Sequence, residues 1–206
     1  MVRTYAIVAG AAIVALIAGV YVATTRGGEE AFAQCRSGQV AGGMGSVGGP
    51  FTLVDQTGQT VTDEDVFTKP SIVYFGYTFC PDVCPADTAR NAIAVDILEE
   101  NGTDVTPVMI SIDPERDTPE VMADYAFNLH DKMIGLTGSL EQVRAASQAY
   151  KTYFNKQDAE DEFYLVDHST FSYLVLPEKG VVEFYRRETT PEEMAESVAC
   201  FVDAAS

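Results

Sequence analysis

The chain has 206 residues, of which 47% are hydrophobic and 21% are charged, and its formal net charge is −18. This length allows one globular domain with an additional segment. The acidity excludes nucleic-acid binding through a basic face, and it fits a solvated surface that keeps the domain soluble, or one that attracts metal cations or a basic partner.

The first segment is an apolar run. Residues 5–23 carry no charge and are long enough to cross a bilayer as a helix. A cleaved signal peptide is the alternative, because Ala31-Phe32-Ala33 has the small-x-small pattern of a cleavage site. That pattern lies well downstream of the run, which is longer than a usual signal core. We therefore predict an uncleaved anchor over residues 1–26, consisting of one transmembrane helix.

Cysteine usage indicates the compartment. Cations near both ends of the apolar run leave its orientation weakly specified, and no Arg-rich mitochondrial presequence is present. The cysteines fit an oxidising compartment outside the cytoplasm. We expect a single-pass protein of the bacterial inner membrane whose soluble domain lies in the periplasm.

A glycine-rich stretch precedes the domain. Residues 38–49 contain six glycines, so we predict a linker over residues 27–48 and a folded domain over residues 49–206. Strands and helices then alternate along the chain. In order, we predict strands over 51–55, 60–62 and 71–79, a helix over 86–100, a strand over 106–113, a helix over 118–130, a strand over 133–137, a helix capped by Ser139 and Gln142, strands over 163–167, 170–176 and 181–185, and a last helix opened by Thr190, Pro191 and Glu193. The acidic residues 158–162 predict an exposed loop or hairpin tip. This order predicts an α/β, thioredoxin-like fold in which helices flank a central mixed sheet.

Two cysteines, Cys80 and Cys84, lie where the third predicted strand meets the next helix. Pro81 fits the first helical position, which would put Cys80 near the N-cap and Cys84 one turn on, at the positive end of the helix dipole. That environment lowers the pKa of a thiol and favours the thiolate, which attacks disulfides and binds metal. A structural disulfide or two buried thiols is the alternative, and the pair alone does not decide between these uses.

The chain has two histidines. His130 lies at a predicted helix end, where an imidazole can cap carbonyl groups, and we interpret it as structural. His168 lies in Val166-Asp167-His168-Ser169-Thr170, between two predicted strands. Its position alone favours a hydrogen-bonded loop histidine over a metal ligand.

Three segments, residues 74–85, 111–119 and 164–169, together resemble the Sco/SenC family of copper proteins. Residues 49–55 are similar to the start of that family's domain, and the resemblance extends from about residue 48 to residue 201. The resemblance rests on the combination of Cys-Pro-Asp-Val-Cys-Pro with a downstream Asp-His-Ser.

The resemblance implies a thioredoxin-like copper metallochaperone that helps to assemble CuA, the dinuclear copper site of cytochrome c oxidase subunit II. It implies that Cys80, Cys84 and His168 bind one copper ion per domain. Thiolates select Cu(I), the imidazole lets Cu(II) remain bound, and an open three-ligand site can pass its metal on. Asp82 complements the helix N-terminus or supports the site, and Asp167 caps a strand end or orients His168.

The expected partners are the CuA domain of subunit II, another periplasmic copper chaperone and, through the anchor, the membrane. An alternative function is that of a thiol–disulfide reductase, with Cys80 and Cys84 as the catalytic pair that keeps the partner's copper-ligand cysteines reduced. A redox or copper sensor is a third. No proline lies between Pro119 and Pro177, where a thioredoxin would carry its cis-proline, and this favours metal binding.

The remaining cysteines, Cys35 and Cys200, are predicted to form a structural disulfide. Cys200 lies off the apolar stripe of the last helix, which Met194, Val198 and Phe201 form, and Cys35 has no core pattern around it. An oxidising compartment favours their pairing, which would tie the leader to the last helix. Two free thiols or a bridge to another chain are the alternatives.

Overall fold

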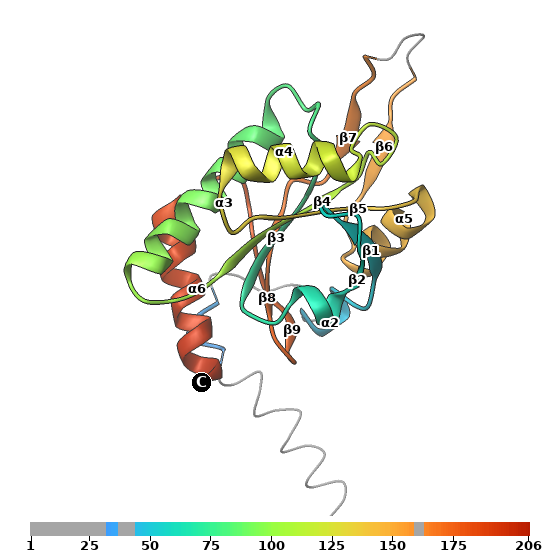
Figure 1. The fold of residues 1–206 in the computed structure, drawn as a ribbon. Helices are drawn as coiled ribbons and strands as arrows, with labels where there is room; N and C mark the ends of the chain where they lie inside the picture. Colours follow the sequence, from blue (N-terminus) through green and yellow to red (C-terminus); the bar gives the residue numbers. More distant parts are fainter. Residues whose placement is uncertain (1–31, 37–43, 159–162) are drawn as a thin grey trace, which may run out of the picture.

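The computed structural model describes residues 32–36, 44–158 and 163–206. The anchor predicted over residues 1–26 lies outside these ranges. Within them, no helix has the length and apolar character needed to span a membrane. The predicted α/β fold is confirmed for the described residues: helices flank a central mixed sheet (Figure 1).

The central sheet has seven strands in the order β2-β1-β5-β4-β3-β8-β9. The strands are β1 (Thr52–Asp55), β2 (Thr60–Thr62), β3 (Ser71–Gly76), β4 (Thr106–Ser111), β5 (Ile134–Thr137), β8 (Ser172–Leu176) and β9 (Gly180–Tyr185). β3, β4 and β5 are parallel, whereas β8 is antiparallel to β3 and β1 is antiparallel to β5. Every residue of β3 is buried, because β3 is a central strand of a sheet covered on both faces.

Six helices surround the sheet in the described part of the chain. They are η1 (Met44–Ser46, a 3-10 helix), α2 (Asp63–Val66), α3 (Val83–Glu100), α4 (Pro119–Leu129), α5 (Leu140–Ala149) and α6 (Pro191–Ala205). The capping boxes predicted at Ser139 and Thr190 open α5 and α6. Successive residues of β3 face opposite sides of the sheet. Ile72 accordingly packs in one cluster with α3 and α6, and Val73 in another with α5.

A separate antiparallel hairpin carries His168. It pairs β6 (Phe154–Lys156) with β7 (Val166–His168) and does not join the central sheet. In Figure 1 the hairpin projects from the sheet at the end of the molecule opposite the C-terminus. The strand predicted over 163–167 is thus shifted toward His168, and β6 was not predicted because it is only three residues long.

The segment before the domain is joined to α6. Cys35 and Cys200 form a disulfide, with their Cα atoms 5.6 Å apart. The Phe32 ring packs on that of Phe201 at 5.2 Å between centroids, and Met44 is buried in the core. The described parts of the predicted linker over residues 27–48 therefore pack on the domain.

Candidate metal centre

Cys80 and Cys84 lie where the chain leaves β3 and enters α3. Cys84 is completely buried, whereas 7% of Cys80 is exposed. The backbone N–H of Cys84 donates to Sγ of Cys80 over 3.3 Å. The helix begins at Val83, with Asp82 at the N-cap, so the prediction that Pro81 is its first residue is wrong. The N-terminal donors of α3 point instead at the sulfur of Cys80.

Gly76, the last residue of β3, makes room for the second sulfur. A β-carbon at this position would lie 3.1 Å from Sγ of Cys84 and 2.7 Å from the ring of Tyr74. A glycine inside a strand often marks such a close approach. The glycine at the end of β3 therefore lets Cys84 pack directly against the strand.

His168 brings an imidazole to the two sulfurs from the hairpin. Its Nε2 lies 3.3 Å from Sγ of Cys84, and its Nδ1 lies 2.8 Å from the carbonyl oxygen of Ser169. Donation from Nδ1 to that carbonyl leaves the lone pair on Nε2, on the side of the sulfur. The rings of Tyr74 and Tyr77 pack edge-on against the imidazole and fix its plane.

The ligand atoms of Cys80, Cys84 and His168 all lie within 4.8 Å of one another. Metal bonds of about 2.0–2.3 Å to nitrogen and sulfur allow one ion to bridge such atoms after a small adjustment. A cleft of about 270 Å³ opens beside them, lined by Cys80 and His168 among others. The arrangement is that of an open metal site with three donors.

The two thiols have different environments. Burial opposes ionisation of Cys80, but backbone N–H groups of Cys84, Asp82 and Val83 outweigh it and lower the pKa of Cys80. Burial raises the pKa of Cys84 above its usual range. The expectation of a lowered pKa thus applies to one cysteine of the pair and is wrong for the other, because the helix N-terminus solvates only the sulfur of Cys80.

Burial also lowers the pKa of His168, and the contact with Ser169 only partly opposes this effect. The imidazole is therefore neutral at neutral pH, as metal binding requires. His130 lies elsewhere: its Nε2 contacts a carboxylate oxygen of Asp96 at 3.2 Å, and its Nδ1 accepts from the N–H of Lys132. These contacts agree with its interpretation as a structural residue.

Neither acidic candidate contacts the ligands through its carboxylate. Asp82 is exposed and makes no side-chain cap, so its contribution comes from its backbone N–H near Cys80. Asp167 accepts a hydrogen bond of 2.7 Å from Nε2 of Gln157. The imidazole of His168 is oriented by Ser169 rather than by Asp167.

A buried carboxylate beneath the site, Asp87, was not predicted. It accepts a hydrogen bond of 3.1 Å from the hydroxyl of Tyr74, the residue whose ring packs on His168. Arg90 and Arg187 approach the same carboxylate at 3.7 and 3.5 Å. Its spacing of three residues from Cys84 on a helix was the available signal, since such residues share a face.

An open site of two cysteine sulfurs and one imidazole on a thioredoxin-like α/β fold defines the class of protein. The chain belongs to the SCO1/SenC family, whose model matches residues 40–203. It is 52% identical to Protein SenC of Rhodobacter capsulatus over 204 residues, which cover 98% of this chain and 91% of that protein. It is 43% identical to the mitochondrial SCO1 homolog 1 of Arabidopsis thaliana over 157 residues, but these cover only 47% of the plant protein.

Solved structures share the fold. The crystal structure of Arabidopsis thaliana ScoI with copper bound has a TM-score of 0.73 and 42% identity, and the match covers 76% of this chain and 98% of that one. BsSco, described as a member of the Sco family of cytochrome c oxidase assembly proteins that has a disulfide switch, has a TM-score of 0.60 and 28% identity, with 78% and 98% coverage.

Proposed function

We propose that the protein binds one copper ion through Cys80, Cys84 and His168 and delivers it to the CuA site of cytochrome c oxidase subunit II. The observation that carries this proposal is the convergence of the three ligand atoms within 4.8 Å. The copper-bound plant relative and the oxidase-assembly role given for BsSco support it.

The chemistry of the donors suits copper as a cargo. Thiolates are soft ligands that select Cu(I), and a neutral imidazole adds a ligand that Cu(II) accepts. Cys80 and His168 line the cleft, whereas Cys84 is completely buried. Ligands of an acceptor can therefore replace Cys80 and His168 first, while Cys84 holds the ion until the end of the transfer.

Copper titration of the full-length protein in detergent against a competing chelator tests the site. We expect one copper per chain and weaker binding after Cys80→Ser, Cys84→Ser or His168→Ala. His130→Ala is the matched control, because it removes the other histidine of the chain and should leave binding unchanged. If His168→Ala leaves both the affinity and the Cu(II)–thiolate absorption unchanged, the three-ligand site is wrong.

The asymmetry of the two thiols favours a second candidate function, thiol–disulfide reduction. The Cys80 thiolate would attack a disulfide of the partner, forming a mixed disulfide and releasing one partner thiolate, which takes up a proton. Cys84 would then lose its proton and attack Sγ of Cys80, releasing the second partner thiol and leaving a Cys80–Cys84 disulfide. The partner gains the two electrons that the pair loses, and both cysteines are free thiols in the structure.

Presenting an oxidised CuA domain to the reduced, metal-free protein separates the two functions. Disulfide transfer to Cys80 and Cys84 without copper supports the reductase. Copper delivery only to an acceptor that is already reduced supports the chaperone. A sensor of copper or redox state would use the same site. In the chaperone function, a second periplasmic copper chaperone would donate the metal.

We also propose that the domain lies in the periplasm, tethered to the bacterial inner membrane by residues 1–26. The apolar run over residues 5–23 and a disulfide between Cys35 and Cys200, which fits an oxidising compartment, support this location. Cell fractionation and protease treatment of spheroplasts test it. A domain that is protected in spheroplasts and digested only after lysis would contradict the proposal.

A further inference from the structure

Arg116, in the loop between β4 and α4, joins several elements around the metal site. Its guanidinium lies 3.6 Å from the ring centroid of Tyr164, 4.8 Å from that of Phe79 and 5.8 Å from that of Tyr77. Its Nε pairs with Asp113 at 2.5 Å, and only 14% of its side chain is exposed. Phe79 and Tyr77 belong to the loop that presents Cys80, whereas Tyr164 leads into the strand that carries His168.

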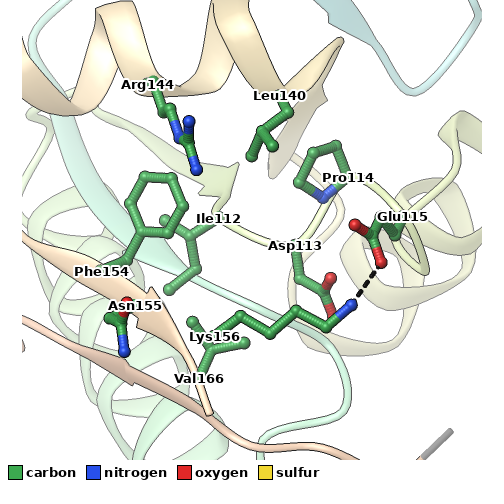
Figure 2. A pocket seen from close by; sticks show the side chains of 10 residues that line it. All are labelled: Ile112, Asp113, Pro114, Glu115, Leu140, Arg144, Phe154, Asn155, Lys156 and Val166. Carbon is green, nitrogen blue, oxygen red and sulfur yellow. Dashed lines mark hydrogen bonds and ion pairs between the residues drawn. The ribbon is translucent and has the colours of Figure 1, made fainter. Parts of the chain in front are cut away.

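Two further contacts hold Tyr164 in place beside Arg116. Its hydroxyl donates to Asp113 over 2.6 Å, and Nζ of Lys156 lies 3.8 Å above its ring. Lys156 in turn pairs with Glu115, as Figure 2 shows. The Tyr164 ring is thus held between two cations, one from the β4–α4 loop and one from the hairpin itself.

The side of the hairpin toward α5 is not packed in this way. A cavity of about 320 Å³ separates the hairpin from α5, with Phe154 and Val166 on one side and Leu140 and Arg144 on the other (Figure 2). The hairpin also shares no strand pairing with the central sheet. Its position over the cysteines therefore depends on the contacts around Arg116 together with Val166, which is buried in the core.

The contacts continue from Arg116 to the imidazole. The hydroxyl of Tyr77 accepts from the N–H of Val166, two residues before His168, and the Tyr77 ring packs against the imidazole. A planar guanidinium can pair with a carboxylate and stack on aromatic rings at the same time. Arg116 thereby links the loop of Cys80 to the strand of His168.

We propose that Arg116 is a positioning residue that keeps the His168 hairpin seated over the cysteine loop and so sets how strongly the imidazole holds copper. This inference rests on the proposed copper site. It differs from that site because Arg116 is not one of the three ligands, and its side chain contacts Asp113 and aromatic rings beside them. Its effect on copper is therefore exerted through His168.

Cu(II) affinity of the full-length protein is measured for Arg116→Met, His168→Ala and the double variant. Arg116→Met should weaken binding about tenfold, as the loss of a residue that supports a ligand does. It should reduce the nitrogen coupling of the imidazole in pulsed electron paramagnetic resonance, while the Cu(II)–thiolate absorption remains. In the His168→Ala background, Arg116→Met should cause no further loss, since both changes remove the same ligand.

Arg144→Met is the matched control, because Arg144 is exposed at the cavity and has no ion-pair partner within the described ranges. If Arg116→Met does not fold, Tyr164→Phe takes its place, because it removes the hydroxyl bonded to Asp113. Its Cu(II) affinity is then measured alone and in the His168→Ala background. Unchanged affinity in the Arg116 variant, or a loss that persists fully in the His168→Ala background, would overturn the inference. If His168→Ala itself binds copper like the wild type, the proposed function fails, and the positioning role fails with it.

Discussion

The sulfur of Cys84 packs directly against the backbone of Gly76, where a β-carbon would lie only 3.1 Å from it. The end of β3 and the first turn of α3 are therefore in close contact at the sulfur of Cys84. A methyl group at residue 76 would displace either this sulfur or the Tyr74 ring, which is 2.7 Å from the same point.

Gly76→Ala should accordingly destabilise the fold by about 1–3 kcal/mol, the usual cost of overpacking a core, and should weaken copper binding. Urea unfolding and chelator competition measure the two effects. Gly45→Ala is the control, because a β-carbon there would meet no atom within 4 Å. A Gly76→Ala protein with unchanged stability and copper affinity would show that the contact is not tight.

Removal of the disulfide should affect stability and not the metal site. Cys35→Ser/Cys200→Ser should lower the free energy of unfolding by about 2–4 kcal/mol, because the bond closes a long loop of the unfolded chain. Urea unfolding of the metal-free protein measures this loss. Copper affinity should stay at the wild-type value, and a clear decrease would mean that the bond also shapes the site.

Alkylation should distinguish the two thiols of the metal-free, reduced protein. The pKa of Cys80 is lowered, so its thiolate forms at a lower pH than that of an ordinary cysteine, and raising the pH should cause Cys80 to react first. The pKa of Cys84 is raised by burial, so its thiol should remain protonated and unreactive over the same range. Peptide mapping after iodoacetamide treatment at several pH values tests the order, and equal labelling of both cysteines would contradict it.

Asp117 should make stability depend on pH. Burial raises its pKa above the ordinary value of 3.8, although Ser111 and Thr78 donate hydrogen bonds to it. The pKa of Asp117 is higher in the folded protein than in the unfolded chain, so the unfolded chain releases this proton at a lower pH. The free energy of unfolding therefore falls as the pH rises from about 3.8 through the pKa of the folded protein.

Asp117→Asn lacks that titration, so its stability should fall less than that of the wild type between those pH values. Urea unfolding at several pH values measures the difference between the two slopes. Because both proteins share every other titrating group, the wild type is the matched control. Identical slopes would exclude Asp117 as a source of the pH dependence.

The sequence was most informative where chemistry and local pattern coincide. The apolar run of β3, the capping boxes at Ser139 and Thr190 and the paired cysteines all have local signals, and the corresponding elements are present. His168 was selected by resemblance, because its position alone favoured a loop residue. The structure places its Nε2 3.3 Å from the sulfur of Cys84.

Features that depend on tertiary contacts could not be predicted. The pKa values of Cys80 and Cys84 shift in opposite directions because the backbone N–H groups at the start of α3 reach the sulfur of Cys80. The sequence motif does not determine this turn geometry. β6 has only three residues, two of them exposed and polar, so no alternation marks it. Asp87 and Arg116 gain their roles from side chains distant in the sequence.

The bond between Cys35 and Cys200 gives the two ends of the described chain a second covalent connection. A protease that cut the backbone between Arg36 and Met44 would therefore not release the domain from whatever precedes Cys35. The fragments would migrate as one species until a reductant opened the bond. Shedding of the metal-binding domain through a cut in this segment would thus require two chemical events, hydrolysis of a peptide bond and reduction of a disulfide.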